Sequence, residues 1–274
     1  AIRLDPQSAK AFGSRGRAYQ MKGECDEAIA DYDEAVRLDP KHAMMYYKRG
    51  LAYEKKGDHD KAIADFTESI RLDPRHATAY FGRGRAYQKK GEFDEAITAY
   101  DEAVRLDPKY ATAHYNRGFS YGKKGDHDKA IADLTEAIRL APELPKGHYE
   151  RGREYLIKGE FDKAIADFTE SIRLDPRYAI AYCGRGTAYD KKGEIDKGIA
   201  DDSEAIRLNS KYATAYYNRG VAYGKKGDHD KAIADFTEAI RLDPTDADAY
   251  YSRGHLHYKQ GDHVKAITDC TEAI

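Results

Sequence analysis

Apolar and polar residues recur with a period of 34 residues along the whole chain of 274 residues. The stretch from Tyr217 to Pro244, YNRGVAYGKKGDHDKAIADFTEAIRLDP, represents the repeating unit, and its near-copies follow one another without insertion or deletion. One glycine marks the same point in every copy: Gly23, Gly57, Gly91, Gly125, Gly159, Gly193, Gly227 and Gly261. Self-similarity at a fixed period of this length predicts an array in which each unit stacks on its neighbours.

Each unit predicts two helices. Tyr216, Gly220 and Tyr223 are spaced four and three residues apart, so they share one face of a first helix, which we call helix A. Gly227 follows two lysines and can adopt the left-handed conformation that ends a helix. A second helix, helix B, has an apolar stripe formed by Ala232, Ile233, Phe236, Ala239 and Ile240. Pro244 ends helix B because it keeps the preceding residue out of the helical region.

This pattern resembles the tetratricopeptide repeat family. Counted from the third residue after each Asp-Pro pair, the family has an aromatic residue at position 4, Gly at 8, Tyr at 11, Ala at 20, an aromatic residue at 24, Ala at 27 and Pro at 32. These positions are filled here by Tyr216, Gly220, Tyr223, Ala232, Phe236, Ala239 and Pro244. The resemblance covers the chain in eight copies and implies an all-α, right-handed superhelical solenoid of antiparallel helix pairs, with helix A inside and helix B outside.

We expect one array without a domain boundary, because a solenoid grows linearly. Residues 1–8 resemble the tail of a preceding repeat, and the repeats are residues 9–42, 43–76, 77–110, 111–144, 145–178, 179–212, 213–246 and 247–274. Both ends fall inside a repeat, so we expect them to be cut from a longer array or to lack a capping helix.

Composition adds few constraints. Lys and Arg number 46 and Asp and Glu 48, a net charge of −2, so the bulk charge favours no particular partner. No apolar run approaches the length of a transmembrane helix. Cys25, Cys183 and Cys270 occupy different repeat positions, which is typical of free thiols in a reducing compartment. We therefore expect a cytoplasmic protein, with a signal peptide upstream of residue 1 left open.

The residues that vary most among the copies lie at positions 2, 6, 9 and 12, opposite the packing stripe of helix A. In the family this face lines a concave groove together with positions 5 and 13. Position 5 carries aromatic residues except at Gly13 and Cys183. Over these six positions there are twelve basic residues, Lys10, Arg17, Lys48, Lys55, Arg85, Lys89, Lys123, Lys146, Arg153, Lys191, Lys225 and Lys259, and four acidic ones, Glu54, Glu150, Asp190 and Asp248. The predicted groove is thus basic and aromatic, while the rest of the chain is acidic.

These features predict a non-enzymatic protein–protein interaction scaffold that binds a peptide or partner helix, preferably acidic, in a basic, Tyr-lined groove. The candidate partner-binding residues are Tyr47, Phe81, Arg85, Tyr115, Asn116, Phe119, Tyr149, Arg153, Tyr217, Asn218 and Tyr251. Three alternatives stay open. The groove could bind single-stranded nucleic acid or another polyanion, which the acidic balance of the chain disfavours; the array could self-associate end to end; or the tyrosines could simply stack on neighbouring helices beside solvated lysines.

No catalytic, cofactor or metal site is predicted. His59, His127, His229 and His263 fall in A/B turns of separate units and do not converge, and only His255, His257 and Cys270 lie near one another in the sequence. No strand with a glycine-rich phosphate loop and no nucleophile with its base are apparent. Some family members bind acidic C-terminal tails of chaperones with a carboxylate clamp of five residues. The nearest match to this clamp is Phe81, Arg85, Asn116, Lys146 and Glu150, of which only Asn116 and Lys146 agree with it. Glu150 would repel the clamped carboxylate, so this function is not expected.

Two further expectations concern packing. Position 7 is arginine in every copy, at Arg15, Arg49, Arg83, Arg117, Arg151, Arg185, Arg219 and Arg253. We expect these arginines to pair with a carboxylate of helix B such as Asp235 or Glu238. The sixth copy has Gly198, Asp202 and Asn209-Ser210 at positions where the repeat pattern has alanine, an aromatic residue and Asp-Pro. We expect Asp202 to find an arginine or the Tyr189 hydroxyl as its partner, helix B to run past its usual end, and this repeat to be the softest of the array.

Overall fold

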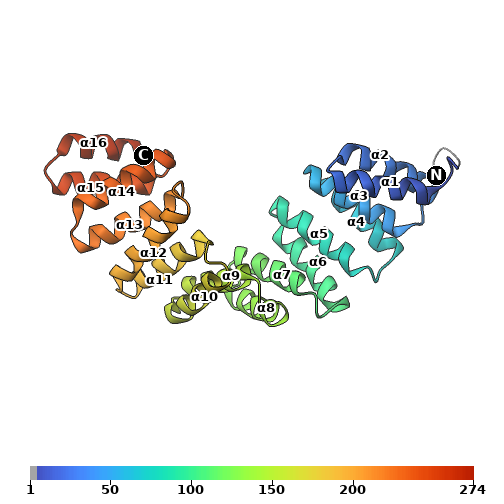
Figure 1. Ribbon diagram of the computed structural model, residues 1–274, viewed down its shortest axis with the longest axis horizontal. Helices are drawn as coiled ribbons and strands as arrows, with labels where there is room; N and C mark the ends of the chain where they lie inside the picture. Colours follow the sequence, from blue (N-terminus) through green and yellow to red (C-terminus); the bar gives the residue numbers. More distant parts are fainter. Residues whose placement is uncertain (1–4) are drawn as a thin grey trace. The chain divides into compact units, whose positions relative to one another are not determined.

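The computed structural model describes residues 5–274, which form sixteen α-helices and no strand (Figure 1). The chain forms two compact units that divide between Ala141 and Pro142. Unit 1 contains α1 (Ala9–Lys22), α2 (Cys25–Leu38), α3 (Ala43–Lys56), α4 (His59–Leu72), α5 (Ala77–Lys90), α6 (Phe93–Leu106), α7 (Ala111–Lys123) and α8 (His127–Leu140). Unit 2 contains α9 (Pro145–Ile157), α10 (Phe161–Leu174), α11 (Ala179–Lys191), α12 (Ile195–Leu208), α13 (Ala213–Lys226), α14 (His229–Leu242), α15 (Ala247–Lys259) and α16 (His263–Glu272). The expected all-α solenoid of antiparallel helix pairs is confirmed, and odd-numbered helices are the A helices.

The predicted helix stops are present. The repeat glycines have φ between 75° and 87°, the left-handed region in which a side chain is strained. At Gly57, for example, the backbone N–H donates to the carbonyl of Glu54 at 3.0 Å and thereby closes the last turn of α3. Glycine at this position lets helix B turn back along helix A after a very short loop.

A second glycine lets the helices approach. Gly50 of α3 and Gly82 of α5 both face Phe66 of α4, which is fully buried. A Cβ atom would lie 2.9 Å from the ring at Gly50 and 2.8 Å at Gly82, closer than such contacts allow. The Phe66 ring is therefore held between two A helices and joins the second repeat to the third.

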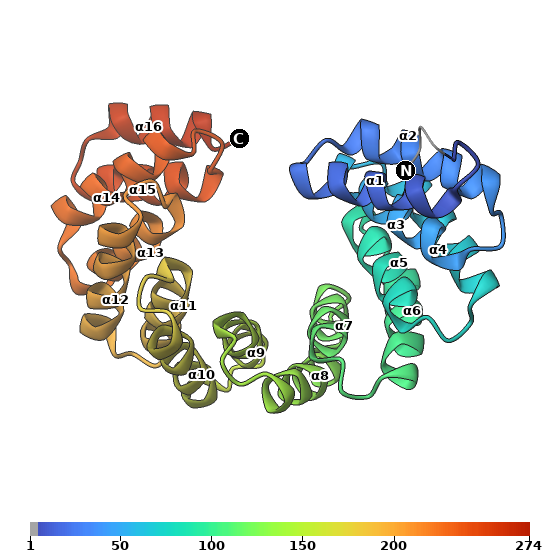
Figure 2. The same cartoon turned by 45° about the vertical axis from the view of Figure 1, so that its right-hand side comes forward.

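The A helices lie on the inner side of each unit. In unit 1, α1 contacts α3, α3 contacts α5 and α5 contacts α7, whereas none of α2, α4, α6 and α8 contacts another B helix over the residues that the structure places. Unit 2 repeats this arrangement with α9, α11, α13 and α15. Figure 2 shows α5 and α7 on one side of unit 1, with α6 and α8 on the other. We call the surface formed by positions 2, 5, 6, 9, 12 and 13 of the A helices the helix-A face.

The position-7 arginines form the expected ion pairs. Seven of them hold an aspartate of their own helix B with two nitrogens at 2.6–2.9 Å: Arg15 with Asp31, Arg49 with Asp65, Arg117 with Asp133, Arg151 with Asp167, Arg185 with Asp201, Arg219 with Asp235, and Arg253 with Asp269. The pairing with Asp235 is thus confirmed, while Glu238 binds Arg241 instead. In Arg49 the remaining nitrogen, Nη1, also reaches Asp33 of the preceding repeat at 2.6 Å, so the arginine ties two repeats together.

The sixth repeat corrects one expectation. Helix α12 ends at Leu208, the same point as in the other repeats, and does not run on. Asn209 replaces the usual aspartate, and its Oδ1 accepts from the backbone N–H of Lys211 at 3.1 Å. Asp243 of the seventh repeat accepts from Thr245 in the same way at 3.0 Å. The side-chain carbonyl of asparagine therefore fixes the turn without the proline.

The expectation that Asp202 pairs with an arginine or with the Tyr189 hydroxyl was also wrong. Arg219 is bound to Asp235 and Ser203, and the Tyr189 ring lies under Lys197 at 5.2 Å. Asp202 is 2% exposed, and its Oδ1 has no hydrogen-bond partner in the part of the chain that the structure describes. Burial raises the pKa of Asp202 to about 8, and the nearby Cys183 thiol opposes this shift. Without a cation beside it, the buried carboxyl favours its neutral, protonated form.

Candidate helix-A binding face

The aromatic residues of unit 1 at position 5 pack partly into the core. The Tyr47 ring centroid lies 5.8 Å from that of Phe66 and 4.7 Å from that of His76. Phe81 is only 9% exposed, because its ring lies 4.8 Å from Tyr110 and against the buried core of its repeat. Tyr115 is half-buried. These residues present part of their side chain to the helix-A face, and Phe81 presents very little.

Unit 2 shows the same packing until its last repeat. Tyr149 lies 5.7 Å from Phe168, and burial raises the pKa of its hydroxyl to about 12. Tyr217 lies 5.8 Å from Phe236. Tyr251 differs, since it is 62% exposed and stacks on the neighbouring His255 with ring centroids 6.4 Å apart. Stacking on the neighbouring helix B is therefore one role of the position-5 rings, and Tyr251 has the most surface left for a partner.

Among the polar candidates in unit 1, the structure brings Arg85 and Phe81 together, with the guanidinium 5.4 Å from the ring centroid. Arg85 also forms an ion pair with Glu54 of the preceding repeat. Asn116 donates to the carbonyl of Thr112 within its own helix at 2.7 Å. The ring of Phe119 lies under the Lys123 ammonium at 5.3 Å.

In unit 2, the two polar candidates have neighbours of different kinds. Arg153 pairs with Glu150 at 2.7 Å. Asn218 of α13 donates to the Thr187 hydroxyl of α11 at 3.1 Å and to the Cys183 sulfur at 3.3 Å. Asn218 and Thr187 hold positions 6 and 9 of successive repeats. Their hydrogen bond shows that side chains at these two positions face each other across the helix-A face.

The two units differ in charge on this face. Unit 1 has seven of the basic residues and one of the acidic residues, and unit 2 has five and three. Within residues 5–274, six cations of unit 1 make no ion pair: Lys10, Arg17, Lys48, Lys55, Lys89 and Lys123. In unit 2, Arg153 and Lys225 are neutralised by Glu150 and Asp190. The positive potential predicted for the groove is therefore concentrated on unit 1.

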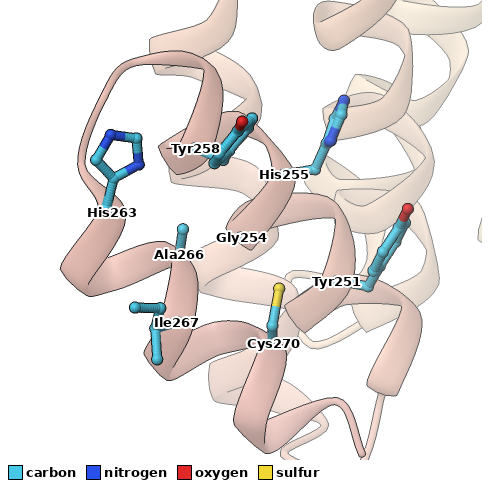
Figure 3. A pocket seen from close by; sticks show the side chains of 8 residues that line it. All are labelled: Tyr251, Gly254, His255, Tyr258, His263, Ala266, Ile267 and Cys270. Carbon is cyan, nitrogen blue, oxygen red and sulfur yellow. The ribbon is translucent and has the colours of Figure 1, made fainter.

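A separate apolar groove of about 360 Å³ lies on the last repeat (Figure 3). Its lining residues are Tyr251, Gly254, His255, Tyr258, His263, Ala266, Ile267 and Cys270. Tyr258 is 64% and Ile267 69% exposed. Cys270 stands where the seventh repeat has Phe236, whose neighbours include Leu256 of the following helix A. The groove thus corresponds to the place at which an interior repeat receives the next helix.

Over the chain from Asp5 onward, no three His, Cys, Asp or Glu side chains are grouped so that they could hold a metal ion. The same residues include no helix that is long and apolar enough to cross a membrane.

Sequence models described as tetratricopeptide repeat match residues 1–43, 14–77, 66–98, 111–144, 213–246 and 247–274, and one described as TPR repeat matches residues 84–125, 152–193 and 188–227. The chain belongs to the tetratricopeptide repeat (TPR) family. A comparison with curated proteins found no match.

Several solved TPR structures are similar to this TPR chain. A tetratricopeptide repeat protein from Parabacteroides merdae is 19% identical with a TM-score of 0.70, covering 91% of this chain and 99% of the other, and this likeness shows the fold. MamA is 30% identical with a TM-score of 0.55, covering 60% and 96%. YrrB, described as a TPR protein with an unusual peptide-binding site, is 25% identical with a TM-score of 0.57, covering 71% and 97%. TPR arrays serve in general as scaffolds for protein–protein interaction.

The sequence-based site residues of this TPR chain omit two cations that the structure singles out, Arg17 and Lys48. Sequence analysis counted both among the basic groove residues and then favoured positions with aromatic neighbours. The available signal was at position 6 of the first repeat, where Ser14 stands in place of the acid Glu150 that pairs with Arg153 in the fifth repeat. A neutral residue there leaves the surrounding cations without a counterion.

Proposed function

We propose that this TPR chain is a non-catalytic scaffold whose helix-A face binds an acidic peptide or an acidic helix. The observation that carries the proposal is the set of six cations of unit 1 that have no ion pair within residues 5–274. Half-buried rings such as Tyr47 and Tyr115 lie on the same face and supply apolar contact area. The description of YrrB as a peptide-binding TPR protein supports a peptide as the partner.

Physical reasoning favours an acidic partner over a neutral one. Carboxylates of a ligand can form charge-assisted hydrogen bonds with lysines that have no ion pair within residues 5–274, and these bonds are shorter and stronger than neutral ones. Arg85 contributes less, because Glu54 already neutralises it. Affinity should therefore depend on Lys55, Lys89 and Lys123 more than on Arg85.

The test is the binding of fluorescein-labelled octaglutamate with an amidated C-terminus, measured by fluorescence anisotropy. The triple variant Lys55→Gln/Lys89→Gln/Lys123→Gln removes three charges from the helix-A face. Its matched control, Lys41→Gln/Arg75→Gln/Lys109→Gln, removes three exposed charges from the loops between repeats. We expect the first variant to bind at least about tenfold more weakly, the control to bind within about twofold of wild type, and the affinity to fall as NaCl rises from about 50 to about 300 mM.

Equal losses in the two triple variants would mean that net charge alone attracts the peptide, which contradicts binding on the helix-A face. Affinity that does not change with salt would contradict the acidic partner itself and leave recognition to the aromatic residues.

A second candidate function is end-to-end self-association. Ala18 of α1 is exposed, whereas its counterparts Ala52 and Ala86 are fully buried against a preceding repeat. The side chain of Arg15 is likewise 48% exposed, against 18% for Arg49. Inside the array, the equivalent surface of a helix A packs against the preceding repeat through small residues such as Ala52. The groove of α15 and α16 is the equivalent receiving surface of the last repeat. A second copy can therefore place its α1 in that groove.

Analytical ultracentrifugation over a range of protein concentrations tests this assembly. We expect a concentration-dependent oligomer that Ile267→Glu or Ala18→Glu abolishes, because each places a charge at the apolar contact. A monomer at all concentrations, or an oligomer that both variants retain, would contradict this assembly.

A further inference from the structure

A second groove, of about 410 Å³, lies between the seventh and eighth repeats and is lined by α14, α15 and α16. We call it the outer groove. Helix α15 contributes Arg253 and His257, at positions 7 and 11. These positions lie on the opposite side of the helix from positions 2, 5 and 9, because an α-helix has about 3.6 residues per turn. The outer groove therefore shares no residue with the helix-A face, and its volume is within the range of about 300–1,000 Å³ that is typical of ligand pockets.

In the other repeats, a tyrosine ring occupies the corresponding place. Position 11 is tyrosine in the first seven repeats and is histidine in the eighth, at His257. The lysine at position 19 lies over this tyrosine at 5.2–5.3 Å in five repeats: Lys61 over Tyr53, Lys129 over Tyr121, Lys163 over Tyr155, Lys197 over Tyr189, and Lys231 over Tyr223. A ring beneath a lysine is thus a regular component of this surface.

In the seventh repeat, the tyrosine contacts two cations that already have counterions. Lys231 lies 5.2 Å from the ring centroid of Tyr223 and pairs with Asp228 at 3.2 Å. Arg219 lies 6.0 Å from the same ring and binds Asp235 with two nitrogens at 2.8 Å. Neither ion pair prevents its cation from lying over the ring, where the negative face attracts positive charge.

The eighth repeat keeps both cations and both ion pairs but lacks the tyrosine. Lys265 pairs with Asp262 at 2.8 Å, and Arg253 binds Asp269 with two nitrogens at 2.6 and 2.9 Å. His257 is 9% exposed, and its Nε2 atom lies 4.0 Å from the Asp269 carboxylate. Over residues 5–274, Lys265 makes no contact with a Phe or Tyr ring. The buried imidazole therefore leaves the outer groove open where the other repeats have their tyrosine.

The lining of the outer groove favours an aromatic occupant over an anion. An anion would compete for Lys265 and Arg253 with the carboxylates that they already bind, whereas a ring leaves both ion pairs intact, as in the seventh repeat. Ile233 supplies an apolar wall. Thr268 stands where the seventh repeat has Ala234, and its hydroxyl donates to a carbonyl of its own helix at 3.1 Å. Its oxygen can therefore accept a hydrogen bond from a phenol.

We propose that the outer groove binds a tyrosine side chain of a protein partner. The ring contacts Lys265 and Arg253 and takes the place that the chain's own tyrosine has in the preceding repeats. Thr268 accepts a hydrogen bond from the phenol. Because the outer groove shares no residue with the helix-A face, this interaction is independent of the acidic-partner function, and the array can bind a second partner while the helix-A face is occupied.

The experiment titrates the whole chain with N-acetyl-L-tyrosinamide and follows the δ1 methyl groups of the isoleucines by NMR. Ile233 lines the outer groove and reports its occupancy. Ile199 holds the same position one repeat earlier, where Tyr223 is present, and is the internal control. We expect a saturable shift of the Ile233 signal, an unchanged Ile199 signal, and no comparable shift with N-acetyl-L-leucinamide, which has no ring.

Two reciprocal substitutions link the response to the missing ring. His257→Tyr restores the residue of the other repeats, so the protein should stay folded. We expect this variant to fill the outer groove and to weaken the response of Ile233 at least about tenfold. Tyr223→His should open the equivalent groove one repeat earlier, so that Ile199 responds as well. Circular dichroism checks that both variants keep their helices.

Several results would overturn the proposal. These are an Ile233 signal that does not move in wild type, an equal response to the leucine amide, and a response that His257→Tyr retains. An Ile199 signal that stays unchanged in folded Tyr223→His would show that a missing tyrosine does not create the site. A shift of Ile233 with inorganic phosphate, but not with the tyrosine amide, would assign the outer groove to an anion and reject the tyrosine.

Discussion

Arg83 shows how one neighbour decides what a repeated arginine does. It is the position-7 arginine of the third repeat, but the aspartate that faces the other arginines is replaced there by the fully buried Ala99. Its Nε atom is buried and has no hydrogen-bond partner in the described part of the chain, and its guanidinium lies 5.4 Å from the ring of Tyr80. An unsatisfied buried donor lowers stability, so this repeat carries a defect that a single substitution can repair.

We predict that Ala99→Asp stabilises the protein by about 2 kcal/mol, because it gives Arg83 the charge-assisted hydrogen bonds that the other repeats have. Asp65→Ala is the matched opposite change, since it leaves Arg49 without its main partner, and it should lower stability by a similar or larger amount. Thermal denaturation followed by circular dichroism measures both. A lower midpoint for Ala99→Asp would show that the cost of burying the new carboxylate exceeds the gain from the ion pair.

Asp202 gives a pH-dependent prediction. Burial raises its folded-state pKa to about 8 from an ordinary value of 3.8, the charges of Asp201 and Asp190 act in the same direction, and Cys183 and Arg219 oppose them. A raised carboxyl pKa means that the folded state holds the proton more tightly than the unfolded state. The contribution to stability is therefore complete below about pH 4 and is lost as the pH rises to about 8.

Asp202→Asn removes this titration. Each unit of pKa shift corresponds to about 1.4 kcal/mol, so the variant should be more stable than wild type by several kcal/mol above pH 8 and by much less at pH 4. Chemical denaturation at pH values from 4 to 9 measures the difference. A difference between the two proteins that stays constant with pH would contradict a protonated Asp202.

At the scale of single helices, much of the fold follows from the sequence because each boundary has a local cause. The glycine at the end of each helix A adopts positive φ in all eight copies. Sequence analysis predicted a longer α12 because it treated Asn209 as a lost stop, whereas the side-chain carbonyl of asparagine forms the hydrogen bond that aspartate forms elsewhere. It also missed that burial raises the pKa of Asp202. Periodicity shows which face a side chain occupies, but the pKa depends on the three-dimensional surroundings.

The sixth repeat is predicted to exchange its amide hydrogens faster than the seventh. Its helix α12 lacks the large ring that fills the interface in the seventh repeat, since Asp202 occupies the position of Phe236. Gly198 also has a lower helix propensity than alanine by about 1 kcal/mol. Hydrogen exchange along the chain should therefore show weaker protection for Lys197–Leu208 than for Lys231–Leu242. Equal protection of the two segments would contradict this prediction.

At the scale of the whole chain, sequence analysis predicted that the groove residues are basic but not how that charge is distributed. The count of basic and acidic residues is readable from the 34-residue period. Which of them pair depends on rotamers across neighbouring repeats, as for Glu54 with Arg85 and Asp190 with Lys225. A count by repeat already gives unit 1 seven basic residues and one acidic residue, against five and three in unit 2. What the sequence does not show is which of these cations remain unpaired. For the same reason, sequence reasoning favoured Arg85 over Arg17 and Lys48.

Lysine footprinting tests the central claim most directly. Acetylation of the whole protein, with and without saturating octaglutamate, reports by mass spectrometry which lysines the peptide covers. We predict protection of Lys48, Lys55, Lys89 and Lys123 on the helix-A face of unit 1, and unchanged labelling of Lys41, Lys61 and Lys109, which lie in loops or on helix B. Protection spread evenly over these lysines, or confined to those off the helix-A face, would contradict the account.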